Sequence, residues 1–167
     1  MPTSSYPTIR LEPARESDLP LILSFIQRLA EYERLADEVT TTRADLQRSL
    51  FGPSPAAEVV IAYADDEPAG FAVYFQSFST FLGRPGLYLE DLFVVPEWRG
   101  RGLGFRLLAH LAGIAVERRY GRMEWSVLDW NELALGVYRR IGAQPLNGWT
   151  VQRLSGAALE SLAASAR

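Results

Sequence analysis

Residues 87–108 read LYLEDLFVVPEWRGRGLGFRLL, and this stretch decides the fold. The run from Leu87 to Val95 is apolar and rich in aromatic and β-branched residues, which predicts a strand. Pro96 ends that strand because proline cannot donate the next ladder hydrogen bond. From Leu103 onward, apolar side chains recur at helical spacing. The stretch therefore predicts a strand and a helix joined by a short turn.

The turn between this strand and helix carries glycine at alternate positions, Gly100, Gly102 and Gly104. Without Cβ atoms, its backbone can approach a ligand closely. Its amides lie at the start of a helix, where unpaired donors and the helix dipole favour an anion such as a diphosphate. The spacing is not that of the dinucleotide fingerprint, and a chain without lysine cannot form a Walker loop. The alternative is an ordinary glycine turn.

Length and composition predict one globular domain over residues 1–167, with 48% hydrophobic and 22% charged residues. No apolar run is long enough to cross a bilayer, and the start of the chain lacks the apolar core of a secretory signal, so we expect a cytoplasmic protein without a membrane partner. The absence of cysteine and the single His110 argue against a metal site. A net charge of −3 argues against a nucleic-acid partner.

Hydrophobic periodicity along the chain predicts a single α/β fold with a mixed, largely antiparallel sheet. Strands are expected over residues 8–11, 58–63, 69–78, 87–95, 122–128 and 143–154, the last as a hairpin strand. Helices are expected over residues 19–34, 40–50 with Thr42 as a candidate cap, 103–120, 131–141 and 155–166.

The pattern Arg-x-x-Gly-x-Gly, at Arg99, Gly102 and Gly104, matches the pyrophosphate signature of the GNAT acetyltransferases. With LYLEDLFV before it, the stretch resembles the diamine acetyltransferase branch, which includes the spermidine/spermine and thialysine acetyltransferases. Residues 131–142 also resemble the family segment N-x-x-(A/S)-x-x-(F/V)-Y-x-x-x-G. The resemblance implies the GNAT fold, which is a mixed, mostly antiparallel sheet with a splayed central strand and flanking helices, and it implies a homodimer.

The resemblance also implies acetyl-CoA as co-substrate, with no metal. Main-chain groups of the central strand would pair with its amide-bearing arm, and the glycine turn would hold its phosphates. A bulge in that strand would free an N–H toward the thioester. Asn131 matches a coenzyme-contacting asparagine and is also a candidate helix cap. The expected coenzyme-binding residues are Leu92, Phe93, Val94, Arg99, Gly100, Arg101, Gly102, Leu103, Gly104 and Asn131.

Glu90 and Asp91 are adjacent carboxylates within an apolar strand, and neighbouring strand residues are expected to face opposite sides of the sheet. Such groups are costly to bury unpaired, so each is either a structural acid or serves the chemistry. By resemblance, Glu90 is the general base toward the ammonium, acting directly or through water, and Asp91 lies beside it as a partner for the substrate's charge. Tyr138 is by resemblance the general acid toward the departing thiolate, because a phenol keeps its proton at neutral pH. The alternative for Tyr138 is a core tyrosine.

The resemblance implies direct transfer to a primary amine of a small cationic molecule, such as a diamine, a polyamine or a thialysine-like substrate. Carboxylates and aromatic faces would hold the cation, and the expected residues are Tyr32, Glu33, Asp91, Glu124 and Trp149. Ser79, Phe81 and Asn147 stand where polyamine-specific members carry acids and a tryptophan, which disfavours spermine. Two alternatives remain: acetylation of a peptide or amino-sugar amine on the same fold, and a coenzyme-A-binding module without catalysis.

Overall fold

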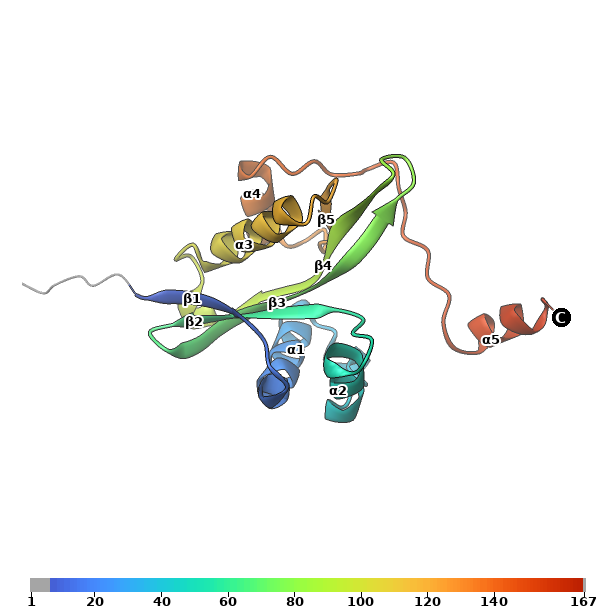
Figure 1. Cartoon of the computed structure of the whole chain (residues 1–167), viewed down its shortest axis with the longest axis horizontal. Helices are drawn as coiled ribbons and strands as arrows, with labels where there is room; N and C mark the ends of the chain where they lie inside the picture. The colour runs from blue at the N-terminus through green and yellow to red at the C-terminus, as the bar shows by residue number, and fades with distance from the viewer. Residues whose placement is uncertain (1–6, 167) are drawn as a thin grey trace, which may run out of the picture. The chain divides into compact units, whose positions relative to one another are not determined.

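The computed structural model describes residues 7–166. Contacts divide the chain into two compact units, with the boundary along the chain between Trp130 and Asn131. Each unit is described by itself. The first unit holds the sheet and its flanking helices (Figure 1). Its elements are β1 (Ile9–Pro13), α1 (Leu19–Glu33), α2 (Arg43–Phe51), β2 (Glu58–Ala64), β3 (Glu67–Ser79), β4 (Arg84–Val94), α3 (Leu103–Glu117) and β5 (Met123–Trp125), with short 3₁₀ turns at Glu16–Asp18, Ala36–Glu38 and Pro96–Trp98.

The sheet of the first unit runs in the order β1-β2-β3-β4-β5. Neighbouring strands are antiparallel except β4 and β5, which are parallel. Helices α1 and α2 cover one face of the sheet and α3 covers the other (Figure 1). The predicted α/β fold with a mixed, mostly antiparallel sheet and flanking helices is therefore confirmed.

The pairing of β4 with β5 is short, and this opens the sheet at its centre. The two strands pair only from Leu87 with Met123 to Leu89 with Trp125, whereas β4 continues to Val94. Beyond Leu89, the β5 side of β4 therefore has no neighbouring strand among the described residues. This is the splayed central strand expected from the sequence, and it leaves main-chain groups of β4 open to a ligand.

Apolar side chains of α1 and α3 hold the layers together. On α1, Ile22 and Phe25 are buried, and the ring of Phe25 lies 5.2 Å from that of Phe71 and 5.9 Å from that of Phe93. On α3, the leucines that predicted the helix, among them Leu103 and Leu107, are almost fully buried. Burying each side chain of this size contributes roughly 1.5–3 kcal/mol, so these contacts fix both helices on the sheet.

The second unit begins with α4 (Glu132–Arg140) and ends with α5 (Gly156–Ala164). The strand expected over residues 143–154 is wrong, because these residues lie in irregular structure. Only residues 149–152 alternate as a strand does, and a strand also needs a neighbour that accepts its hydrogen bonds. Trp149 and Val151 within this segment are each 81% exposed.

Two local expectations also have clear outcomes. Thr42 caps α2, with its side chain accepting from the amide of Asp45 at 3.2 Å while the Asp45 carboxylate accepts from the amide of Thr42, and so the predicted cap is confirmed. The strand expected over residues 122–128 is shorter, Met123–Trp125, because β4 diverges from it after Leu89. No described helix has the length and apolarity needed to span a membrane.

Candidate active site

The glycine turn has the backbone geometry that its sequence predicts. Gly100 has φ 72° and Gly102 has φ 79°, a left-handed region that residues with a side chain rarely adopt. Gly102 is also the N-cap of α3, where no side chain accepts a hydrogen bond from the first turn. A Cβ built on Gly104 would lie 3.9 Å from side-chain atoms of Leu92 and Val94, so α3 packs closely on β4 here. The turn therefore fits a diphosphate held by main-chain amides.

The two arginines of the turn lie against aromatic rings. Arg99 donates from Nε to the carbonyl oxygen of Val94 at 2.9 Å. Its guanidinium carbon lies 4.5 Å from the ring centre of Tyr32 on α1 and 5.5 Å from that of Phe93. Arg101 lies 5.0 Å from the ring centre of Trp98, within the same turn region. Of the two guanidinium groups, the one of Arg99 thus connects the turn to α1.

The open side of β4 presents the main chain of alternate residues. Val95 donates its amide to the carbonyl of Ala69 on β3 at 2.9 Å. Because antiparallel strand residues alternate in the side to which their main chain points, Phe93 also faces β3, whereas Leu92 and Val94 face the opening beside β4. Among the three residues expected to pair with the amide arm of the coenzyme, Leu92 and Val94 are therefore the two whose main chain faces the opening.

A β-bulge in β4 sets the direction of the two carboxylates. Tyr74 pairs with Leu89 and the preceding Val73 pairs with Asp91, so Glu90 is an extra residue in β4. Paired residues share a face of the sheet, which places Asp91 with Val73 on the α1 side. Glu90 follows the alternation of Tyr88, whose ring meets Phe75 on that same side at 5.1 Å.

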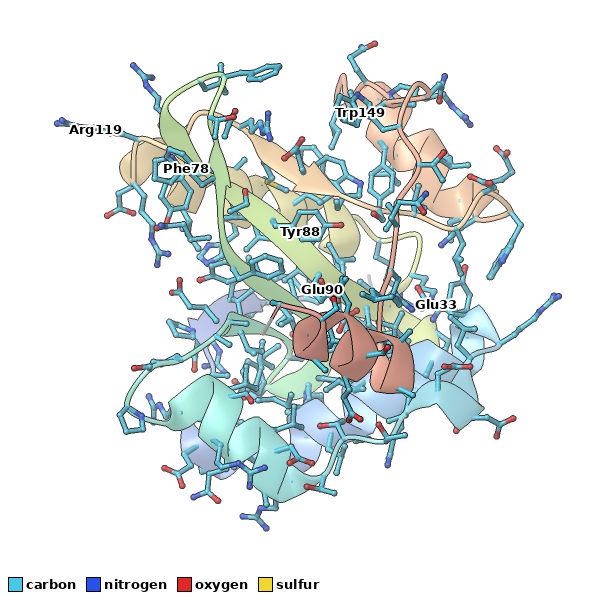
Figure 2. The ribbon with its side chains drawn as sticks, turned by 90° about the vertical axis from the view of Figure 1, so that its right-hand side faces the viewer. Glu33, Phe78, Tyr88, Glu90, Arg119 and Trp149 are labelled. Carbon is cyan, nitrogen blue, oxygen red and sulfur yellow. The ribbon has the colours of Figure 1, made fainter. Side chains whose placement is uncertain are left out.

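The expectation that the two carboxylates face opposite sides is therefore wrong. The physical reason is that the extra residue at Glu90 shifts the alternation by one position, so Glu90 and Asp91 both face α1. Figure 2 shows Tyr88 and Glu90 along β4, and Glu33 at the end of α1.

Three carboxylates from α1 and β4 form the acidic cluster, which is made of Glu33, Glu90 and Asp91. Burial, followed by the charges of Glu90 and Glu33, raises the pKa of Asp91 to about 6. Burial also raises the pKa of Glu33 above its ordinary value. Gathered negative charge that is partly removed from water attracts a cation, and it provides a group able to accept a proton near neutral pH.

The remaining predicted residues lie as follows. In the first unit, the ring of Tyr32 lies 5.9 Å from that of Trp130, and the carboxylate of Glu124 on β5 pairs with Arg122 at 2.8 Å. In the second unit, Asn131 caps α4 by accepting from the amide of Ala134 at 3.2 Å, as expected of it as a cap. Tyr138 lies in α4, and Trp149 lies in the irregular segment that follows.

The structure thus brings Tyr32, Glu33, Glu90, Asp91 and Arg99 together within the first unit. The sequence alone did not reveal Arg28 and Trp130 as neighbours of this group. Arg28 lies 5.4 Å from the ring centre of Phe93, and Trp130 meets Tyr32. Nothing in the local sequence signals these contacts, because they join segments that are distant along the chain. Among the described residues no cluster of potential metal ligands is present.

Comparison with known proteins identifies the family of this chain. Residues 23–143 match the model of the acetyltransferase (GNAT) family. A thialysine N-epsilon-acetyltransferase of Bos taurus is 36% identical, over 93% of this chain and 97% of the relative. An L-ornithine N5-acetyltransferase of Arabidopsis thaliana is 28% identical, over 96% of this chain and 90% of the relative. Among solved structures, an integron cassette protein from the mobile metagenome of V. cholerae matches with a TM-score of 0.76 and 28% identity, over 93% of this chain and 97% of the other.

Proposed function

The chain belongs to the acetyltransferase (GNAT) family and is an acyltransferase, and we propose that it transfers the acetyl group of acetyl-CoA directly to a primary amine of a small cationic molecule. Members of this family use acetyl-CoA as co-substrate. The observation that carries the proposal is the bulge in β4, because it turns Glu90 and Asp91 together toward Glu33, one short segment before the glycine turn. The proposed cation site and the proposed diphosphate site would thus lie along one strand and the turn that follows it.

Main-chain groups and the helix start would hold the co-substrate. The amides of residues 100–104 would bind the diphosphate, and Leu92 and Val94 would pair with the amide-bearing arm through the open side of β4. Arg101 adds positive charge to the turn, and Asn131 is proposed to contact the coenzyme in addition to capping α4. When bound, acetyl-CoA supplies an activated acyl group as its thioester.

The acidic cluster would receive and activate the amine. Glu33 and Asp91 attract the ammonium group, and Glu90 takes a proton from it so that the nitrogen lone pair is free to attack. As the carbon–nitrogen bond forms and the carbon–sulfur bond breaks, Tyr138 would donate its phenolic proton to the departing thiolate, and the second proton lost by the nitrogen would return to the phenolate. Tyr32, Glu124 and Trp149 complete the residues proposed on the amine side.

The relatives narrow the proposed acceptor. Thialysine N-epsilon-acetyltransferases and an L-ornithine N5-acetyltransferase are both similar over nearly the whole chain. Each name specifies the amine at the end of an amino-acid side chain. Ser79 in this chain is buried and accepts from the amide of Leu82, and Phe81 is 97% exposed, so neither supplies the extra negative charge that a long polycation requires. We therefore place thialysine and ornithine ahead of spermine.

An acceptor screen tests this proposal. Release of free thiol from acetyl-CoA is measured with thialysine, ornithine, lysine, spermidine, spermine and a short peptide. The chain has no lysine, so acetylation of the protein itself contributes little background. We expect turnover on the amino-acid side-chain amines and a loss of about 10²- to 10⁴-fold in Glu90→Gln. Glu67→Gln, an exposed carboxylate at the start of β3, is the matched control.

Two results would replace the proposal. Preferred turnover of the peptide would favour the peptide acetyltransferase. Tight binding of acetyl-CoA with no turnover on any amine would favour a coenzyme-binding module without catalysis.

We further propose that residues 1–167 act as one catalytic domain that forms a homodimer in the cytoplasm. The relatives support the single domain, since the Bos taurus protein aligns over 97% of its own length. The dimer is supported by apolar side chains that the second unit leaves exposed, namely Leu146, Trp149, Val151, Leu159 and Leu162. Light scattering of the purified protein tests the dimer, and cell fractionation tests the location.

A further inference from the structure

Arg99 links three parts of the first unit. It is the residue directly before Gly100, where the left-handed part of the turn begins. Its Nε donates to the carbonyl of Val94 at the end of β4, at 2.9 Å. Its guanidinium lies 4.5 Å from the ring centre of Tyr32 in the last turn of α1. One side chain thus contacts the end of β4 and the end of α1 from the start of the glycine turn.

This contact belongs to a longer series in which guanidinium groups alternate with aromatic rings. Phe93 lies between Arg28 and Arg99, with guanidinium-to-ring distances of 5.4 Å and 5.5 Å. On the other side, Tyr32 lies 5.9 Å from Trp130, and Trp130 lies 5.5 Å from the guanidinium of Arg34. The series in order is Arg28, Phe93, Arg99, Tyr32, Trp130 and Arg34.

Three members of the series, Tyr32, Trp130 and Arg34, contact one another at the end of α1. Arg34 follows α1 with φ 62° and ends the helix, and Tyr32 and Arg34 both meet Trp130. Each guanidinium–ring contact of this kind is attractive, and its stacking component depends on the flat guanidinium face that lysine lacks. Glu33 lies between Tyr32 and Arg34, so whatever fixes these two residues also fixes Glu33 relative to Asp91.

We propose that Arg99 is a positioning residue that couples the two substrates. Its side chain connects the end of α1, where Tyr32 and Glu33 lie, to the start of the glycine turn at Gly100. Co-substrate held in the glycine turn then also holds Glu33 beside Asp91, and the amine binds more tightly. The inference rests on the proposed function. It differs from the expectation that Arg99 is a direct phosphate ligand, because its guanidinium is held by Tyr32, Phe93 and the Val94 carbonyl.

Calorimetry on the full chain tests the coupling. Free CoA is the probe, because it carries no acetyl group and forms a non-reacting complex with thialysine. The dissociation constant of thialysine is measured without CoA and with saturating CoA, and the ratio of the two is the coupling factor. For the unaltered chain we expect a ratio of about 10, within the usual range for linked sites.

Five variants separate coupling from phosphate binding. Arg99→Lys keeps the charge but loses the flat stack, and Tyr32→Leu removes the ring, so each should reduce the ratio to about 1–2. The double variant should reduce it no further. Tyr32→Phe keeps the ring and should keep the ratio. Arg10→Lys is the matched control, because Arg10 lies on β1, 5.1 Å from the ring centre of Tyr63 and away from the glycine turn, and its ratio should equal that of the unaltered chain.

Steady-state kinetics provide a second readout. At saturating acetyl-CoA, Arg99→Lys should raise KM for the amine by about the factor of 10 by which it lowers coupling, and by reciprocity KM for acetyl-CoA at saturating amine should rise by a similar factor, whereas the dissociation constant of CoA alone should change little. A merely structural role would lower the melting temperature and the active fraction and would leave both KM values unchanged. Arg99→Lys and Tyr32→Leu alter different elements, so if one variant fails to fold, the coupling ratio of the other variant still tests the proposal.

Four outcomes would overturn the proposal: a ratio of 1 in the unaltered chain, an unchanged ratio in Arg99→Lys, a reduced ratio in Arg10→Lys, or no binding of thialysine to the unaltered chain at millimolar concentration. A chain that acetylates amines but has a ratio of 1 loses the coupling and keeps the proposed function. A chain that turns over no amine loses the proposed function itself.

Discussion

Asp91 of β4 pairs with Val73 of β3, one residue later than a register without a bulge would require. The shift makes Glu90 an additional residue and directs both carboxylates toward α1, where Glu33 meets them. The acidic cluster of the proposed acetyltransferase therefore exists because of a defect in sheet pairing. The same strand then reaches the glycine turn that would hold acetyl-CoA.

Asp91→Asn should make the protein more stable above pH 6. The pKa of Asp91 rises from 3.8 to about 6 on folding, so the folded chain binds the proton more tightly than the unfolded chain. Stability from this group is present below pH 3.8 and is lost as the pH rises through about 6. Asparagine remains neutral, and we expect a gain of about 2 kcal/mol at pH 8 and almost none near pH 4. Urea unfolding at both pH values measures it.

Asp37→Asn is the control for this prediction, because Asp37 is an exposed aspartate outside the cluster. Its effect on the urea midpoint should be small at both pH values. If the Asp91→Asn chain is equally stable or less stable at pH 8, then ionised Asp91 stabilises the fold. That result would contradict the position of Asp91 beside Glu90 and Glu33.

Tyr138→Phe should lower kcat by about 10²- to 10⁴-fold, as expected for loss of a general acid. The substitution removes only the hydroxyl, so α4 and the binding of free CoA should be nearly unchanged. Thiol release and calorimetry with CoA measure the two quantities. An unaltered kcat would exclude Tyr138 from the chemical step and leave it as a packing residue.

Gly102→Ala should weaken acetyl-CoA binding and destabilise the fold. Gly102 has φ 79°, and a residue with a Cβ pays roughly 1–2 kcal/mol there, which the chain can relieve only by changing the turn. We expect KM for acetyl-CoA to rise about tenfold, which corresponds to ~1.4 kcal/mol.

Gly113→Ala provides the matched control in the same helix region. Gly113 lies within α3, a Cβ there would meet no atom within 4 Å, and it carries no positive φ. The helix should gain roughly 0.5–1 kcal/mol with kinetics unaltered. Equal KM values for the two variants would mean that the left-handed turn is not what binds the diphosphate.

Val151→Glu should convert the proposed dimer to a monomer. Val151 is 81% exposed in the irregular segment of the second unit, and a charge there would prevent an apolar surface from being covered by a second copy. Val116→Glu on α3 is the control, because it is the same substitution at a side chain that is 78% exposed. It should leave the mass of the dimer in solution unchanged. Light scattering reports both. A dimer that persists in Val151→Glu would place the interface elsewhere.

Local sequence was sufficient for the features whose cause is local. An apolar strand, a proline that ends it, glycines and an amphipathic helix specify β4, the turn and α3, because strand propensity, left-handed backbone and helical periodicity each depend on neighbouring residues. The same stretch was enough to indicate the family that the comparisons then showed. The cap at Thr42 followed in the same way.

Tertiary structure alone decided the features that join distant segments. The bulge at Glu90 depends on how β3 and β4 align, and the stack of Arg99 on Tyr32 depends on where α1 crosses β4. Residues 143–154 were expected to include a strand but are irregular, because hydrogen bonds to a neighbouring strand, and not a short alternating pattern, make a strand stable. Sequence periodicity states which side chains share a face, whereas cross-strand register and packing determine which faces meet.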